Sequence, residues 1–327
     1  MMFIILLVAF SICVLFFTNM IVPYVLEYGN NFRIIDKPDS RKQHKIPIVR
    51  IGGLGIFIGF IFCSLSAYFL VFKSVLVESQ ANIFILICIA SLFFFIIGFL
   101  DDLFKLSPLF RLVSEIAISL IAWEQGLRIS VIDINLLGDI SFTYSLPTLL
   151  SILLTTIWLV GVTNAINWID GLDGLAIGVT ISSAIGIVFI SLNFYQYGSA
   201  FFATGIAASA LGFLKYNKYP AKILMGDGGS YFLGFSLASL SISGATNSLG
   251  ITSIDLSFLT LAIPVLDMTF VIFRRLCEGN APFLPDRKHI HHRLLDRGLS
   301  HPKTVIAINL FNILLVCLAI FLSYNIY

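Results

Sequence analysis

The sequence predicts an all-α polytopic membrane protein with about ten transmembrane helices. Hydrophobic residues make up 58% of the 327 residues and charged residues only 12%, with a mean hydropathy of +0.98. A soluble domain carries about 25% charged residues. Several apolar runs reach the roughly 20 residues that a helix needs to span a bilayer. The basic residues between these runs fall almost entirely on one side of the predicted membrane.

The predicted helices follow the apolar runs in chain order. Residues 128–144, between the fourth and fifth runs, alternate apolar and polar positions around Gly138-Asp139, which predicts a small β-hairpin on the outer side. We treat residues 1–327 as a single integral-membrane domain without a soluble part large enough for its own core. The predicted helices cover residues 2–26, 52–72, 82–100, 109–126, 146–163, 175–194, 198–214, 227–244, 254–275 and 303–325.

The distribution of lysine and arginine predicts the orientation. Of the 20 such residues, only Lys73 and Arg128 lie on one side of the predicted spans. Cytoplasmic loops carry an excess of these residues, so the other side is cytoplasmic and both termini face outward. The net charge of only +2 gives no indication of a nucleic-acid surface. The cytoplasmic side holds Arg33, Lys37, Arg41, Lys42, Lys45, Arg50, Lys105, Arg111, Lys215, Lys218, Lys222, Arg274, Arg275, Arg287, Lys288, Arg293, Arg297 and Lys303.

The stretch 163–176 is the most informative part of the chain. It lies between two long apolar runs and contains Asn164, Asn167, Asp170 and Asp173, two Asp-Gly pairs and no basic residue. Ionisable groups at the edge of a membrane are costly and usually mark a site. A polar turn that caps two helices would account for one Asn and one Asp-Gly pair, but not for two of each. The pattern therefore favours a ligand site.

Two adjacent acids, Asp101 and Asp102, lie at the inner end of the third predicted helix. Adjacent carboxylates repel each other unless a cation or a shared proton relieves them. Lys105 lies one helical turn after Asp101 and is expected to compensate part of this charge. A Mg²⁺ ion held by one or two carboxylates and by substrate phosphates fits the pair better than a solvated helix end does.

A further acid, Asp227, opens the eighth predicted helix. Glycines flank it within the segment Met225-Gly226-Asp227-Gly228-Gly229-Ser230, and glycine lets the backbone approach a ligand closely. An acid at a helix start also complements the helix dipole, which is an alternative explanation for its presence.

Two basic loops lie on the same side as these acids. Loop 36–53 contains Arg41 and His44, which are candidates for phosphate binding, although such a loop would also anchor the chain to anionic lipid. Loop 285–295 has three histidines in four positions. Zinc binding is not supported there, because neither a Cys nor an HExxH pattern accompanies them. Hydrogen bonding to phosphates suits these side chains better, and the candidates are Arg287, His289, His291, His292 and Arg293.

Together these segments supply acids and amides for a divalent cation, and His, Arg and Lys for phosphates. Such a set suits the transfer of a phosphoryl-linked group to a lipid. No GxxxxGK[ST] loop is present, so ATP hydrolysis is not supported. The chain resembles the polyprenyl-phosphate N-acetylhexosamine-1-phosphate transferases, a superfamily that includes the bacterial muramyl-pentapeptide translocase. The resemblance rests on five motifs between Asp36 and Leu294: D-x-P-x-x-R-K-x-H followed by G-G, D-D-x-x-K, N-x-x-N-x-x-D-G-x-D-G-L-A, G-D-x-G-S and H-I-H-H-R-L.

The resemblance implies a reaction. UDP-N-acetylglucosamine is the expected donor, undecaprenyl phosphate from the bilayer is the expected acceptor, and Mg²⁺ is the cofactor, for which Mn²⁺ can substitute. The lipid phosphate attacks the β-phosphorus and UMP leaves, on the cytoplasmic face of the bacterial plasma membrane. The His-Ile-His-His form resembles the branch that starts O-antigen, enterobacterial common antigen or teichoic-acid linkage units.

The resemblance also implies a role for each motif. Asp227 and Asn167 hold Mg²⁺ on the diphosphate, and Asp170 and Asp173 lie near the uridine. Asp101, Asp102 and His291 are the catalytic residues, with the two acids addressing the lipid phosphate. The sequence leaves open whether an Asp acts as a base and whether the chain forms a homodimer. The remaining candidates bind substrate: Lys105, Asn164, Arg41, His44, Arg287, His289, His292 and Arg293.

Three alternative functions fit the sequence less well. A phospho-MurNAc-pentapeptide translocase typically has three consecutive histidines, which segment 289–292 lacks. A CDP-alcohol phosphotransferase needs Ala-Arg soon after its first Asp-Gly, and residues 172–177, which follow Asp170-Gly171 here, contain no arginine. A lipid-linked sugar transporter would place charges at the bilayer midplane between repeats. Only Glu115 and Asp267 lie clearly within predicted spans, both toward the inner end, and no repeat is visible.

Cysteine labelling tests the predicted orientation. Pro38→Cys, Lys218→Cys and Lys288→Cys should react with an impermeant maleimide only after the inner face is opened, because they lie on the basic side. Asn135→Cys, in the predicted hairpin, is the outward-facing control and should react in intact cells. Labelling of Lys288→Cys in intact cells would contradict the orientation.

Overall fold

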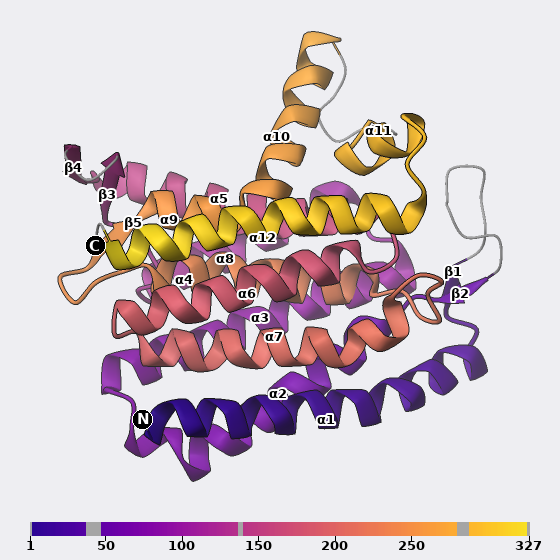
Figure 1. The fold of residues 1–327 in the computed structure, drawn as a ribbon, viewed down its shortest axis with the longest axis horizontal. Helices are drawn as coiled ribbons and strands as arrows, with labels where there is room; N and C mark the ends of the chain where they lie inside the picture. The colour runs from indigo at the N-terminus through magenta and orange to yellow at the C-terminus, as the bar shows by residue number, and fades with distance from the viewer. Residues whose placement is uncertain (1, 37–46, 137–139, 280–287, 326–327) are drawn as a thin grey trace.

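The structure is a computed structural model that describes residues 2–36, 47–136, 140–279 and 288–325. Within these residues the chain is largely helical (Figure 1). Seven of the described helices are long and apolar enough to cross a membrane, and a bent pair provides an eighth if it counts as one span. The predicted α-helical polytopic class is therefore confirmed. The count of ten spans and the outward termini stay predictions.

A helix is present at each of the ten predicted positions, with boundaries that differ by a few residues. The short helix α11 falls in a segment that was expected to be a loop. The helices are α1 Met2–Asn31, α2 Gly52–Leu70, α3 Glu78–Phe104, α4 Pro108–Glu124, α5 Thr148–Ile169, α6 Leu175–Asn193, α7 Tyr197–Asn217, α8 Gly226–Gly244, α9 Ile254–Thr260, α10 Ala262–Cys277, α11 Ile290–Asp296 and α12 His301–Asn325, with a 3₁₀ turn at Phe72–Ser74.

Helix α8 forms the centre of the bundle. Every residue from Gly228 to Ile242 is buried, and its neighbours include α3, α5 and α6. The helix is rich in glycine and serine, and small residues allow helix backbones to approach closely in a membrane. Gly234 lies against the backbone of Thr163 in α5. The small side chains of α8 therefore let its neighbours pack directly on its backbone.

The two ends of the bundle carry different small sheets. Figure 1 places both chain termini at the end of the bundle that carries β3 and β4, and places β1 and β2 at the opposite end together with α11. Strands β3, Val131–Leu136, and β4, Ile140–Ser145, pair antiparallel, which confirms the predicted hairpin. Strand β5, Ile251–Ser253, joins β3 in parallel and was not predicted, because three residues show too little alternation. At the other end, the antiparallel pair consists of β1, Ile35–Asp36, and β2, Ile48–Val49.

The predicted helix 254–275 is not continuous. It consists of α9 and α10, which meet at 85°. Pro264 explains the break, because it has no N–H for the carbonyl of Thr260 and its ring would clash with that carbonyl in a continuous helix. The Ser183 hydroxyl of α6 donates a 2.6 Å hydrogen bond to the freed Thr260 carbonyl. Figure 1 shows α10 leaving the bundle at a steep angle to α12.

The substitution Gly234→Ala tests the packing of α5 on α8. A Cβ atom at Gly234 would lie 2.7 Å from the Cα of Thr163. Because a backbone atom cannot move aside cheaply, we expect a loss of about 1–3 kcal/mol and a lower melting temperature of the purified protein in detergent. Gly161→Ala is the control, since its Cβ would meet only the Met268 side chain at 3.7 Å. Equal melting temperatures for the two variants would argue against this packing.

Candidate functional site

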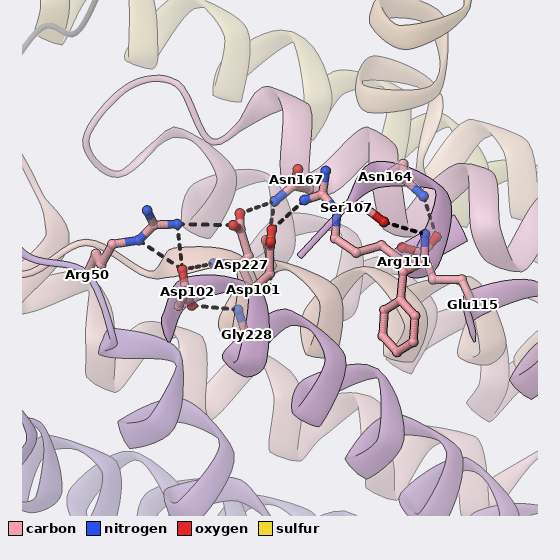
Figure 2. Close-up of polar contacts among 12 residues, drawn as sticks. Arg50, Asp101, Asp102, Ser107, Arg111, Glu115, Asn164, Asn167, Asp227 and Gly228 are labelled. Atoms are coloured by element: carbon pink, nitrogen blue, oxygen red, sulfur yellow. Dashed lines mark hydrogen bonds and ion pairs between the residues drawn. The ribbon is translucent and has the colours of Figure 1, made fainter. Parts of the chain in front are cut away.

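Three of the predicted motifs converge at the end of the bundle that carries β1 and β2. Asp101 and Asp102 lie in the last turn of α3, Asp227 lies in the first turn of α8, and Asn167 lies in the last turn of α5. Figure 2 shows the side chains of Asp102, Asp227 and Asn167 joined in one network. Segments that are distant in the sequence therefore form one polar cluster.

The carboxylate of Asp102 is the most enclosed group of this cluster, with 1% of its side chain exposed. Its Oδ1 accepts a 3.0 Å hydrogen bond from the backbone N–H of Asp227. Its Oδ2 accepts a 2.9 Å hydrogen bond from the backbone N–H of Gly228. These N–H groups are among the donors that a helix leaves free in its first turn. An acid of α3 therefore caps α8 and complements its dipole.

Arg50 joins the acids of α3 and α8, and its place in the site was not predicted from the sequence. Its Nε and Nη2 donate to Oδ1 of Asp102 at 2.9 and 2.7 Å. Its Nη2 also donates to Oδ2 of Asp227 at 3.0 Å. One guanidinium thus relieves the repulsion between two carboxylates. In the sequence Arg50 is one of several basic residues in its loop, and only the fold distinguishes it.

Tight backbone contacts hold Arg50 against the start of α8. The N–H of Gly53 donates to the carbonyl of Met225 at 2.7 Å. A Cβ at Gly53 would lie 2.2 Å from the nitrogen of Gly229, and a Cβ at Gly226 would lie 2.0 Å from the carbonyl oxygen of Arg50. The glycines next to Asp227 therefore serve the approach of the protein's own backbone.

Asp101 pairs with Arg111 of α4 rather than with Lys105. The Nη1 of Arg111 donates a short hydrogen bond to Oδ2 of Asp101. The expectation that Lys105 compensates Asp101 was wrong among the described residues, because α3 ends at Phe104 and Lys105 turns away with a φ of 51°. The i,i+4 rule applies only while the helix continues. Arg111 follows Asp101 by ten residues, and this spacing does not predict a contact between the two side chains.

The two amides of α5 have different partners. The Nδ2 of Asn167 donates to Oδ1 of Asp227 at 2.7 Å and to Oγ of Ser230 at 2.8 Å. With its amide hydrogens engaged, the oxygen of Asn167 is directed away from these groups. Asn164 lies one turn earlier, and its Nδ2 donates to Oε2 of Glu115 in α4 at 2.6 Å. Asn164 therefore contacts a buried acid of the bundle and not Asp227.

Asp170 and Asp173 lie in the turn between α5 and α6, in different surroundings. The Oδ2 of Asp173 accepts a 2.9 Å hydrogen bond from the N–H of Ala221, which fixes the connection before α8. No such bond is found for Asp170 within the described part of the chain. Desolvation and the negative charges of Asp227, Asp173 and Asp102 raise the pKa of Asp170 well above its usual range. A cation bound nearby would oppose this shift.

His291 of α11 packs against this turn. It is 1% exposed, and neither ring nitrogen has a hydrogen-bond partner among the described residues. A Cβ at Gly171 would lie 2.3 Å from its Nε2, so only glycine leaves room for the ring. Burial, together with His292, His289 and His301, lowers the pKa of His291 to about 3. The imidazole is therefore neutral at pH 7.

Asp267 of α10 holds the start of α11. Its Oδ1 accepts a 2.7 Å hydrogen bond from the N–H of Ile290, and its Oδ2 lies 2.8 Å from Nδ1 of His289. His289 is thus buried in a structural contact, although it was predicted to bind substrate. Arg293 is exposed and lies over the ring of Phe270 at 4.9 Å. The ring of His292 lies 4.2 Å from that of His291.

The remaining candidates Arg41, His44 and Arg287 lie outside the described residues. Among the described ones, no group of three or more His, Cys, Asp or Glu side chains is placed to hold a metal ion. A divalent ion at the predicted position beside Asp227 and Asn167 would therefore need substrate oxygens to complete its coordination. Magnesium is commonly bound in this way, through one or two carboxylates plus phosphates.

Comparisons with known proteins point to the same chemistry. A profile described as Glycosyl transferase family 4 matches residues 83–245. A probable undecaprenyl-phosphate N-acetylglucosaminyl 1-phosphate transferase of Bacillus subtilis is 34% identical over 93% of this chain and 81% of its own length. A decaprenyl-phosphate N-acetylglucosaminephosphotransferase of Mycobacterium tuberculosis is 32% identical over 84% and 72%. An undecaprenyl-phosphate alpha-N-acetylglucosaminyl 1-phosphate transferase of Escherichia coli is 27% identical over 96% and 83%. With such identity over nearly its whole length, the chain belongs to glycosyl transferase family 4.

Proposed function

We propose that this protein transfers N-acetylglucosamine 1-phosphate from UDP-N-acetylglucosamine to undecaprenyl phosphate and releases UMP. The names of its relatives describe transferases of this kind. The observation that carries the proposal is the convergence of Arg50, Asp102, Asp227 and Asn167 from four separate segments. The cluster offers oxygens for a divalent cation and a guanidinium for phosphate. In our proposed orientation it lies at the cytoplasmic face of the bacterial plasma membrane.

We assign the cofactor as Mg²⁺, with Mn²⁺ as a substitute. Asp227 would hold it together with oxygens of the donor diphosphate, and the amide of Asn167 would turn its oxygen toward the ion in place of its hydrogen bond to Asp227. Asp227 is the accessible acid of the cluster, with 23% of its side chain exposed against 1% for Asp102. When bound, the ion supplies positive charge for the diphosphate and for the departing UMP.

The reaction exchanges one phosphorus–oxygen bond for another. An oxygen of the lipid phosphate bonds to the β-phosphorus, and the bond from that phosphorus to the bridging oxygen breaks. UMP carries away the bonding electron pair. A phosphate monoester has a second pKa of about 6 and is mostly ionised at pH 7, so the attack does not require a base. Asp102, whose side chain is 1% exposed and is enclosed by Arg50 and the first turn of α8, is therefore assigned a positioning role in place of the catalytic role that the resemblance implies.

We assign the acceptor phosphate to Arg111 and its partner Asp101. Arg111 lies near the start of α4, where Leu109, Phe110 and Val113 expose 70%, 55% and 56% of their surfaces. Large apolar side chains exposed on a transmembrane protein contact lipid. A phosphate carried on a lipid chain would therefore reach Arg111 from the bilayer, while the nucleotide enters from the cytosol.

We assign His291 to the donor. Both of its ring nitrogens lack a partner among the described residues although the side chain is buried, and such groups are rare unless a ligand completes them. Because its pKa is lowered, the neutral ring has one N–H to donate and one nitrogen to accept. A hydrogen bond from this N–H to the diphosphate would strengthen as charge develops on the leaving oxygens.

Release of UMP by the purified protein tests the function. We expect release only when UDP-N-acetylglucosamine, undecaprenyl phosphate and a divalent ion are all present, with loss of activity in EDTA and recovery with Mg²⁺ or Mn²⁺.

Asp227→Asn should reduce turnover at least about a hundredfold, since several kcal/mol of charge stabilisation rests on the ion. Asp133→Asn, at the other end of the bundle, is the control. Preference for UDP-MurNAc-pentapeptide would indicate a translocase, and absence of UMP would favour a transporter.

A matched pair of substitutions tests the role of the α5–α6 turn. In the presence of Mg²⁺, which would favour the charged form of Asp170, Asp170→Asn should weaken the binding of UDP-N-acetylglucosamine by about tenfold, because a ligand would lose a charged acceptor that has no hydrogen bond within the described residues. Asp173→Asn should change it little, since an amide oxygen can still accept the N–H of Ala221. Calorimetry on both purified variants measures the difference. A larger effect at Asp173 would refute this assignment.

A further inference from the structure

We infer that Arg50 is a catalytic residue that binds phosphate oxygens of a substrate, and that Asp102 is the positioning residue that aims it. The inference rests on the proposed function and deepens it. None of the matching motifs contains Arg50, which lies in the short segment between β2 and α2. The evidence for a role of Arg50 is the set of contacts that its side chain makes.

The guanidinium of Arg50 keeps donors available for a ligand. Of its five N–H donors, those on Nε and Nη2 are directed at Asp102 and Asp227. Oδ1 of Asp36 lies 3.9 Å from Nη1, beyond hydrogen-bond distance, and no hydrogen bond from Nη1 is found within the described part of the chain. The side chain is 23% exposed. Nη1 can therefore donate to an incoming group without breaking the existing network.

The position of Arg50 suits phosphate. It contacts Asp227, the acid that we assign to the divalent ion, at 3.0 Å. Phosphate oxygens that share this ion would lie next to the guanidinium. A guanidinium can bond Asp102 through Nε and Nη2 and still direct Nη1 at a phosphate oxygen, which the single nitrogen of a lysine cannot do.

The contacts of Arg50 also fix the plane of its guanidinium. Asp102 accepts from both Nε and Nη2, and two backbone N–H groups of α8 hold Asp102 in turn. The carbonyl of Arg50 is wedged against Gly226, where no Cβ could fit. A counter-ion needs only a positive charge near the acids. A residue that stabilises charge developing on a transferring phosphoryl group needs more, namely hydrogen-bond donors already held in a fixed direction before the reaction. The contacts of Arg50 meet this second requirement.

The variant Arg50→Lys separates these two roles, because it keeps the positive charge and removes the fork. We expect it to melt like the wild-type protein, while kcat/KM falls by about tenfold to a hundredfold, the value of one lost hydrogen bond to a charged group. The binding affinity for the donor and the KM for the acceptor together show which substrate carries the phosphate that Arg50 binds. Weaker binding of UDP-N-acetylglucosamine in calorimetry identifies the donor diphosphate, and a raised KM for undecaprenyl phosphate alone identifies the lipid.

Two further variants complete the experiment. Arg33→Lys, in the segment before β1, is the control and should leave all parameters unchanged. Asp102→Asn should lower kcat/KM as Arg50→Lys does, and the double variant should lose little more, because the two residues act as one unit. Wild-type binding and turnover in Arg50→Lys would overturn the inference and leave Arg50 as a counter-ion. A wild-type protein that releases no UMP would instead overturn the proposed function.

Discussion

The arrangement of the site depends on the buried carboxylate of Asp102. A charge removed from water costs several kcal/mol unless ion pairs and hydrogen bonds replace its hydration. Here Arg50 and two backbone N–H groups of α8 replace it. These partners come from the segment before α2 and from the start of α8. The hydrogen bonds of Asp102 therefore connect both segments to the end of α3. Without the acid, a guanidinium and two helix-end donors would lose their shared acceptor.

This contact is available only because α3 and α8 approach each other closely. Gly98 lies one helical turn before Asp102, and a Cβ there would lie 2.3 Å from the carbonyl oxygen of Asp227. Any larger residue would push the two helices apart and lengthen the hydrogen bonds of Asp102. Close packing through small residues, common between membrane helices, thus determines the geometry of the polar cluster.

The sequence was sufficient for the features that follow from local rules. Apolar runs gave the helix positions, the alternation in 128–144 gave the hairpin, and the spacing of acids and glycines gave the candidate site. The break before α10 also had a local signal in Pro264, which the length of the apolar run concealed. Arg50 and Arg111 could not be identified in this way. Their importance comes from contacts across the fold, which neither spacing nor charge reveals in a chain with 20 basic residues.

The charge of the cluster explains why it needs more than its own residues to bind a diphosphate. Within the cluster, the two guanidinium groups of Arg50 and Arg111 pair with three carboxylates, those of Asp101, Asp102 and Asp227. An anionic substrate would be repelled by the remaining negative charge, and a divalent ion would balance it. Once a divalent ion has balanced this negative charge, a side chain beside the ion with unused N–H groups can donate hydrogen bonds to phosphate. Arg50 meets this requirement, because Asp102 directs its guanidinium without engaging Nη1.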